Sequence, residues 1–170
     1  LGIKKEDYAF LLHTDIARIT HSWQEEIVTR LSSELIEISQ KNEKLLTEMV
    51  QESYNDLIRS INLARSFYEM SDLPVPALDE VISAVKDALA REMLLVQKVN
   101  SDEDVKFLLD DSGQLRLRTP LNIFIGGQIL DRGITIKNMI SFYYGRNPKK
   151  FQQDTVLQHS RMYGARTKED

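Results

Sequence analysis

The chain has 170 residues, a net charge of −4 and no cysteine, and this length fits one domain with a substantial core. The lack of cysteine excludes a disulfide scaffold, a thiolate metal site and a cysteine nucleophile, and it favours a reducing, cytoplasmic location. Because the net charge is negative, any contact with nucleic acid must use a local basic surface. No apolar run approaches the roughly 20 residues of a membrane span, so we expect no membrane partner.

The first half of the chain predicts one strand followed by helices. The apolar run 8–13 is long enough for a buried strand. Glycine and proline are absent from 17–73, where apolar residues recur at helical spacing, which predicts helical hairpins or one long broken helix. Pro74 and Pro76 end this stretch, and a further helix follows over 78–89. We therefore predict a helical insertion over 32–91.

The second half predicts a return to strands. Apolar runs at 93–99, 122–125 and 139–144 are typical of core strands, with a short helix over 103–109, a short edge strand over 115–118 and a last helix over 154–162. Strands that alternate with helices predict an α/β fold with a mostly parallel sheet flanked by helices. We expect 1–170 to form a single domain, cut from a larger protein, with the insertion between its first two strands.

Glycines at the end of a predicted strand mark one candidate site. Gly126 and Gly127 end the strand 122–125, and ligands of parallel α/β sheets bind at such carboxyl ends, where backbone N–H groups hold phosphate. Thr14 follows the first strand in the same way. A simple turn explains the glycines equally well. Arg132 is suited to a phosphate, but a structural ion pair with Asp131 is the favoured alternative.

Two arginines near the end of the last predicted helix mark a second candidate site. Arg161 and Arg166 carry planar donor groups that match phosphate. Their five-residue spacing puts them on different faces of a helix, unless Gly164 ends the helix and turns both into one cleft with Gln158. The alternative is a favourable interaction with the helix dipole.

Other features give weaker signals. The histidines show no metal-binding spacing, and no metal site is predicted. The acidic cluster of Asp102, Asp104, Asp110 and Asp111 would suit a metal-dependent nuclease, but a solvated turn is the favoured interpretation. Trp23 lies among isoleucines at helical spacing, which predicts that it packs in the core.

Together these residues resemble the second RecA-like domain of superfamily-two helicases, and most of all the Z-one (Z1) domain family of helicase-like ATPases, often labelled endonucleases. Segment 126–135 resembles helicase motif five, segment 158–166 motif six, and segment 10–14 motif four. The matched positions are Leu130, Arg132, Gly133, Thr135, Phe142-Tyr143-Tyr144, Arg146-Asn147, Asp154 to Gln158, Arg161, Gly164 and Arg166. Ser160 departs from the usual glycine, and Thr135 stands where many helicases have an acid.

The resemblance implies a DNA helicase or translocase in which ATP binds between two RecA-like domains, with this chain as the second. ATP and Mg²⁺ would be held mainly by the N-terminal domain of the parent, since this sequence has no GxxxxGK[ST] loop, and the fragment alone is expected to be inactive. A restriction or defence role is implied at the family level. The alternative is a non-catalytic α/β module that binds DNA or docks a protein.

The resemblance also implies roles for particular residues. The expected catalytic residues are Arg161, Arg166 and Gln158; the expected nucleotide-binding residues are Arg132, Gly133 and Thr135; the expected contacts with the DNA backbone, without base readout, are Thr14, Gly126, Gly127 and Arg146.

Overall fold

The computed structural model describes residues 6–13, 18–68, 74–99, 101–109, 115–126, 136 and 138–145. Four strands and four helices form along these ranges. In chain order they are β1 (Tyr8–His13), α1 (Arg18–Lys41), α2 (Glu43–Tyr68), α3 (Leu78–Ala90), β2 (Leu94–Val99), α4 (Asp102–Leu108), β3 (Leu121–Gly126) and β4 (Met139–Tyr144). They fall into two compact units: a sheet unit of Leu1–Arg30 with Leu94–Asp170, and a helical unit of Leu31–Met93.

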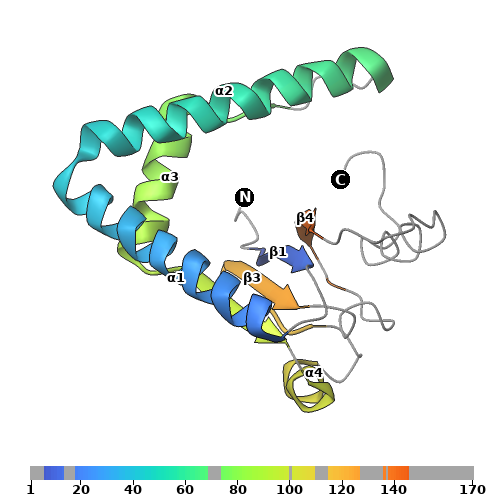
Figure 1. Ribbon diagram of the computed structural model, residues 1–170. Helices are drawn as coiled ribbons and strands as arrows, with labels where there is room; N and C mark the ends of the chain where they lie inside the picture. Colours follow the sequence, from blue (N-terminus) through green and yellow to red (C-terminus); the bar gives the residue numbers. More distant parts are fainter. Residues whose placement is uncertain are drawn as a thin grey trace. The chain divides into compact units, whose positions relative to one another are not determined.

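The sheet unit is built on a four-stranded sheet in the order β2-β3-β1-β4, in which every neighbouring pair is parallel (Figure 1). The strands are runs of apolar residues, as expected for a sheet that is covered on both faces. The α/β prediction with a parallel sheet and flanking helices is confirmed. Helices α1, α2 and α3 all lie between β1 and β2 in the sequence.

One face of the sheet carries the main apolar core. Ala9 and Leu11 of β1 pack with Phe124 of β3, and each is at most 1% exposed. Leu108 of α4 joins the same cluster, as does Leu115. Because alternate residues of a strand point to one face, this cluster places α4 and the segment around 115 over a single face of the sheet.

Two asparagines fasten the amino-terminal edge of the sheet. The Asn122 side chain is 2% exposed and donates to the carbonyl oxygens of Tyr8 (3.1 Å) and Thr119 (2.6 Å). Asn138 has a φ of 51° and donates from its side chain to the Asp7 carbonyl (3.0 Å). Asparagine tolerates this left-handed backbone better than most residues, so the chain turns into β4 while its side chain holds the start of β1.

The helical unit is organised by local caps. Asn42 separates α1 from α2, and its side-chain oxygen accepts a hydrogen bond from the Leu45 N–H (3.1 Å). At the start of α3, the Glu80 carboxylate accepts from the Ala77 N–H (2.8 Å). Both contacts satisfy backbone donors that a helix start leaves without a partner. The predicted helix over 78–89 is confirmed.

Two predictions from the sequence are wrong. Trp23 is 60% exposed and does not pack in the core, because it lies on a side of α1 that no described residue covers. Residues 115–118 do not form an edge strand; Leu115 makes a single antiparallel bridge to Leu109. This bridge closes the turn after α4, with the Arg116 N–H donating to the Leu108 carbonyl (2.8 Å), instead of extending the sheet.

Candidate ligand-binding edge of the sheet

The connections between strands run over opposite faces of the sheet. Lys98 and Val99 are adjacent in β2, so their side chains point to opposite faces. The Lys98 ammonium lies 2.6 Å from the Glu25 carboxylate of α1, whereas Val99 belongs to the cluster that contains Leu108 of α4. Ile136, between β3 and β4, is buried in this same cluster. Helix α1, which comes after β1 in the chain, therefore lies on one face of the sheet, and Ile136, which comes after β3, lies on the other with α4.

This arrangement makes a topological switch point at the carboxyl ends of β1 and β3. The two strands are neighbours in the sheet, with His13 paired to Gly126, and the described residues that come next in the chain, α1 after β1 and Ile136 after β3, lie on opposite faces. In open α/β sheets the crevice at such a point is where ligands bind. The registers also align Val99 and Tyr144 with this pair, so all four strands end along one line.

His13 is a buried polar residue at this edge. It is 0% exposed, and its ring centroid lies 6.1 Å from that of Phe142 in a tilted arrangement. Its carbonyl oxygen accepts a hydrogen bond from the Gly145 N–H (2.8 Å), which ties the end of β4 to the end of β1. Gly126, its partner at the end of β3, carries no side chain and is itself buried.

Gly126 is the one predicted site residue that lies within the described residues. It ends β3 at the switch point and is buried. The other predicted site residues lie outside the described residues; they are Thr14, Gly127, Arg132, Gly133, Thr135, Arg146, Gln158, Arg161 and Arg166. In the sequence, Thr14 directly follows β1 and Gly127 directly follows β3, while Arg146 comes two residues after β4.

A hollow lies beside the carboxyl end of β2. It has a volume of about 500 Å³ and is lined by Gln97, Lys98, Asp104, Phe107 and Leu108. Phe107 is 72% exposed, and the guanidinium of Arg118 lies 5.0 Å from its ring centroid. Of these side chains, only Asp104 was a candidate from the sequence, as part of the acidic cluster, because nothing in the residue spacing shows that α4 and residues 115–118 come together.

The two units differ in charge. The helical unit has 12 acidic and 6 basic side chains, a net charge of −6, whereas the sheet unit has 14 acidic and 16 basic side chains, a net charge of +2. The net charge of −4 on the whole chain is therefore the sum of a negative helical unit and a weakly positive sheet unit. A positive balance suits a unit that contacts phosphates.

The described part of the chain contains no cluster of three or more His, Asp, Glu or Cys residues that would hold a metal ion. None of its helices combines the length and apolar character needed to cross a membrane.

Fold and edge together define an α/β protein with a parallel sheet and a switch point between β1 and β3, an arrangement consistent with RecA-like domains. The model of the Z1 domain family matches residues 2–169, nearly the whole chain. The chain therefore belongs to the Z1 domain family. Neither the curated proteins nor the solved structures contain a significant match to it.

Proposed function

We propose that this chain is the second motor domain of an ATP-dependent DNA helicase or translocase. The observation that carries the proposal is the switch point: segments 10–14 and 126–135, which resemble helicase motifs four and five, contain the neighbouring ends of β1 and β3. Membership of the Z1 domain family supports the same role.

In this proposal the arginines act on a nucleotide that another domain holds. ATP with Mg²⁺ supplies the phosphoryl group and part of the neutralising charge. Arg161 and Arg166 contact the γ-phosphate as arginine fingers, which contribute about 10³–10⁵ in rate in other phosphoryl-transfer proteins. Gln158 orients the nucleotide or the attacking water. Arg132, with Gly133 and Thr135, couples the nucleotide to bound DNA.

The DNA contacts follow from the same edge. Thr14, Gly126 and Gly127 sit at or directly after the ends of β1 and β3, where backbone N–H groups can meet phosphate oxygens without reading bases. Arg146, shortly after β4, adds a positive charge. The net charge of +2 on the sheet unit supports backbone binding. The parent is then an ATP hydrolase, with any nuclease or restriction activity carried elsewhere.

The proposal is tested by measuring ATP hydrolysis by the intact parent protein. Arg161→Ala and Arg166→Ala should each lower turnover by about 10³-fold while ATP binding stays unchanged. Arg59→Ala, which removes an exposed arginine of α2, is the matched control and should keep wild-type turnover. Wild-type turnover in either finger variant, or magnesium-dependent turnover by this chain alone, would contradict the proposal.

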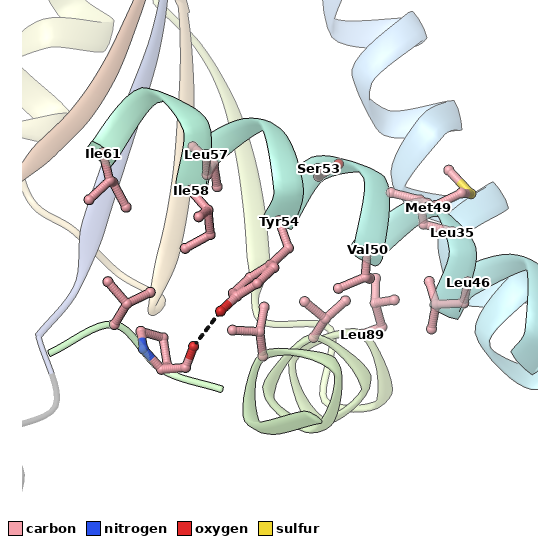
Figure 2. A pocket seen from close by; sticks show the side chains of 14 residues that line it. Leu35, Leu46, Met49, Val50, Ser53, Tyr54, Leu57, Ile58, Ile61 and Leu89 are labelled. Carbon is pink, nitrogen blue, oxygen red and sulfur yellow. Dashed lines mark hydrogen bonds between the residues drawn. The ribbon is translucent and has the colours of Figure 1, made fainter. Parts of the chain in front are cut away.

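A non-catalytic docking module is the second candidate, and one observation favours it. The helical unit contains an open apolar groove between α2 and α3 (Figure 2). A chain that binds a protein through this groove, and that takes no part in ATP hydrolysis, would fit that candidate.

A further inference from the structure

An exposed aromatic ring and an arginine form a pair at the hollow between β2 and α4. Phe107 of α4 lines this hollow and is 72% exposed. The guanidinium of Arg118 lies 5.0 Å from the centre of the Phe107 ring, within the range of a cation–π contact. Most of the ring therefore stays open to a ligand, while a planar cation is already placed against it.

The backbone on both sides of this pair is held in place. Leu108, which follows Phe107 in α4, is 4% exposed and belongs to the core of the sheet unit. Its carbonyl oxygen accepts a hydrogen bond from the Arg116 N–H (2.8 Å). The Arg118 N–H donates to the side-chain oxygen of the buried Asn122 (3.2 Å). Because this framework is already ordered, a ligand that meets the pair orders little more than the two side chains.

The charges around the pair favour an anionic ligand with a planar, unsaturated group. The acidic residues of α4 lie at 102–104, and the basic Lys106, Arg116 and Arg118 follow, all three exposed. Asp104, which lines the hollow, accepts a backbone hydrogen bond (3.0 Å) at the start of the helix. Among the described residues, no carboxylate lies within ion-pair distance of the Arg118 guanidinium. A purely apolar partner would desolvate this guanidinium without compensation.

We propose that Phe107 and Arg118 form a stacking surface for an unpaired base of single-stranded nucleic acid. The base stacks on the exposed ring, as bases do on aromatic side chains of other proteins that bind single strands, and a neighbouring phosphate pairs with the guanidinium. Every base has a π-face, so the contact selects single strands without reading their sequence. A base inside a duplex is already stacked on its neighbours and does not reach the ring.

This inference rests on the proposed function only for the choice of nucleic acid as the partner. It names the form of nucleic acid, which the proposed function leaves open, and it uses side chains of α4 and residues 115–118 instead of the backbone at the ends of β1 and β3. It does not require ATP turnover.

The test uses the full chain and a fluorescent single-stranded DNA of about 15 nucleotides, with binding measured by fluorescence anisotropy. Phe107→Ala should weaken binding by about tenfold, within the range for one lost stacking contact. Phe107→Leu keeps an apolar side chain but has no π-face, so it should lose nearly as much affinity, whereas Phe107→Tyr should bind like wild type. Circular dichroism verifies that each variant is folded.

Two further probes separate stacking from phosphate contact. A DNA of the same length with abasic sites keeps every phosphate; it should bind wild type at least about tenfold more weakly than the normal probe, and it should bind wild type and Phe107→Ala equally. A duplex should also be insensitive to Phe107→Ala. The abasic probe by itself reports the phosphate contacts of the proposed function, so the two proposals fail separately.

A matched control comes from the other unit. Phe67 of α2 is 76% exposed, so Phe67→Ala removes an equally exposed ring and should leave the affinity unchanged. An equal loss of affinity in Phe67→Ala would show that exposed rings of this chain hold DNA without a specific site, and would overturn the proposal.

Five other results would also overturn the proposal. They are no saturable binding of the single-stranded probe, unchanged affinity in Phe107→Ala, wild-type affinity in Phe107→Leu, equal binding of the normal and abasic probes by wild type, and displacement of the probe by free ATP that Phe107→Ala abolishes. The last result would show that the ring takes the base of a free nucleotide instead of a base in a strand.

Discussion

The two units of this chain bury their apolar residues to very different extents. In the sheet unit, Leu11, Val99 and Phe124 are all 0% exposed. Among the described residues of the helical unit, Leu46 is the buried hydrophobic residue, while Leu57, Leu63 and Phe67 are each more than half exposed. The sheet unit closes its own core, whereas the helical unit keeps a large apolar surface open.

This difference indicates a division of labour. Large exposed apolar surfaces of a folded unit mark places where other chains bind, and the helical unit combines such a surface with a charge of −6. The sheet unit instead presents the aligned strand ends of a switch point and a charge of +2. We therefore propose phosphate chemistry for the sheet unit and protein contacts for the helical unit.

The largest expected loss of stability comes from a substitution in the core of the sheet unit. Phe124→Ala removes a fully buried ring and should lower the free energy of unfolding by about 3–5 kcal/mol. Phe67→Ala in α2, where the ring is 76% exposed, should change it by less than about 0.5 kcal/mol. Urea unfolding followed by circular dichroism compares the two variants. Equal losses would show that the helical unit has a core of its own around Phe67.

A smaller effect on stability is expected from the hydrogen bond between Tyr54 and segment 74–76. Tyr54→Phe removes the hydrogen bond to the Pro76 carbonyl but keeps the ring, so it should cost about 0.5–1.5 kcal/mol in unfolding free energy. Tyr68→Phe, at a residue that is 67% exposed, is the control and should be neutral in the same unfolding experiment. A neutral Tyr54→Phe would mean that segment 74–76 is not held by this contact.

The smallest effect concerns pH and the contact between α2 and α3. The hydrogen bond from Lys86, with its positive charge, lowers the pKa of Glu43 below 4.5. The pair therefore stabilises the helical unit above about pH 4.5, and this contribution is lost as the pH falls through the lowered pKa. Both groups are accessible to solvent, so the effect is small.

The measurement is the unfolding midpoint of wild type and Glu43→Gln between about pH 6 and pH 3. Wild type should be the more stable at pH 6, and the two proteins should converge toward pH 3. Glu37→Gln is the comparison, since Lys41 lowers the pKa of Glu37 within a single helix. A difference between wild type and Glu43→Gln that persists unchanged at pH 3 would contradict this assignment.

Local sequence was enough to predict most elements but not their arrangement. The run at 8–13 coincides with β1, and the prolines at 74 and 76 separate α2 from α3, because apolar runs and proline act over a few residues. The position of β1 between β3 and β4 depends on contacts more than 100 residues apart in the sequence, which local patterns do not encode. The switch point therefore appeared only in the structure.

The wrong predictions have the same origin. Trp23 lies among isoleucines at helical spacing, yet spacing shows only that residues share a face, not that another element covers it. The groove was missed because it depends on the unequal lengths of α2 and α3 and on the return of segment 74–76 to Tyr54. The charge difference between the units was present in the sequence, but it becomes visible only when the boundaries near Arg30 and Leu94 are drawn.

The most direct test of this division of labour is hydrogen–deuterium exchange on the full chain with and without a single-stranded DNA oligonucleotide. We predict slower exchange in peptides that cover the carboxyl ends of β1 and β3 and the residues that follow them, with no change in α2 and α3. Peptides at the carboxyl ends should respond regardless of the base sequence, because phosphates are contacted without base readout. Protection confined to α2 and α3, with an unchanged sheet edge, would contradict the account.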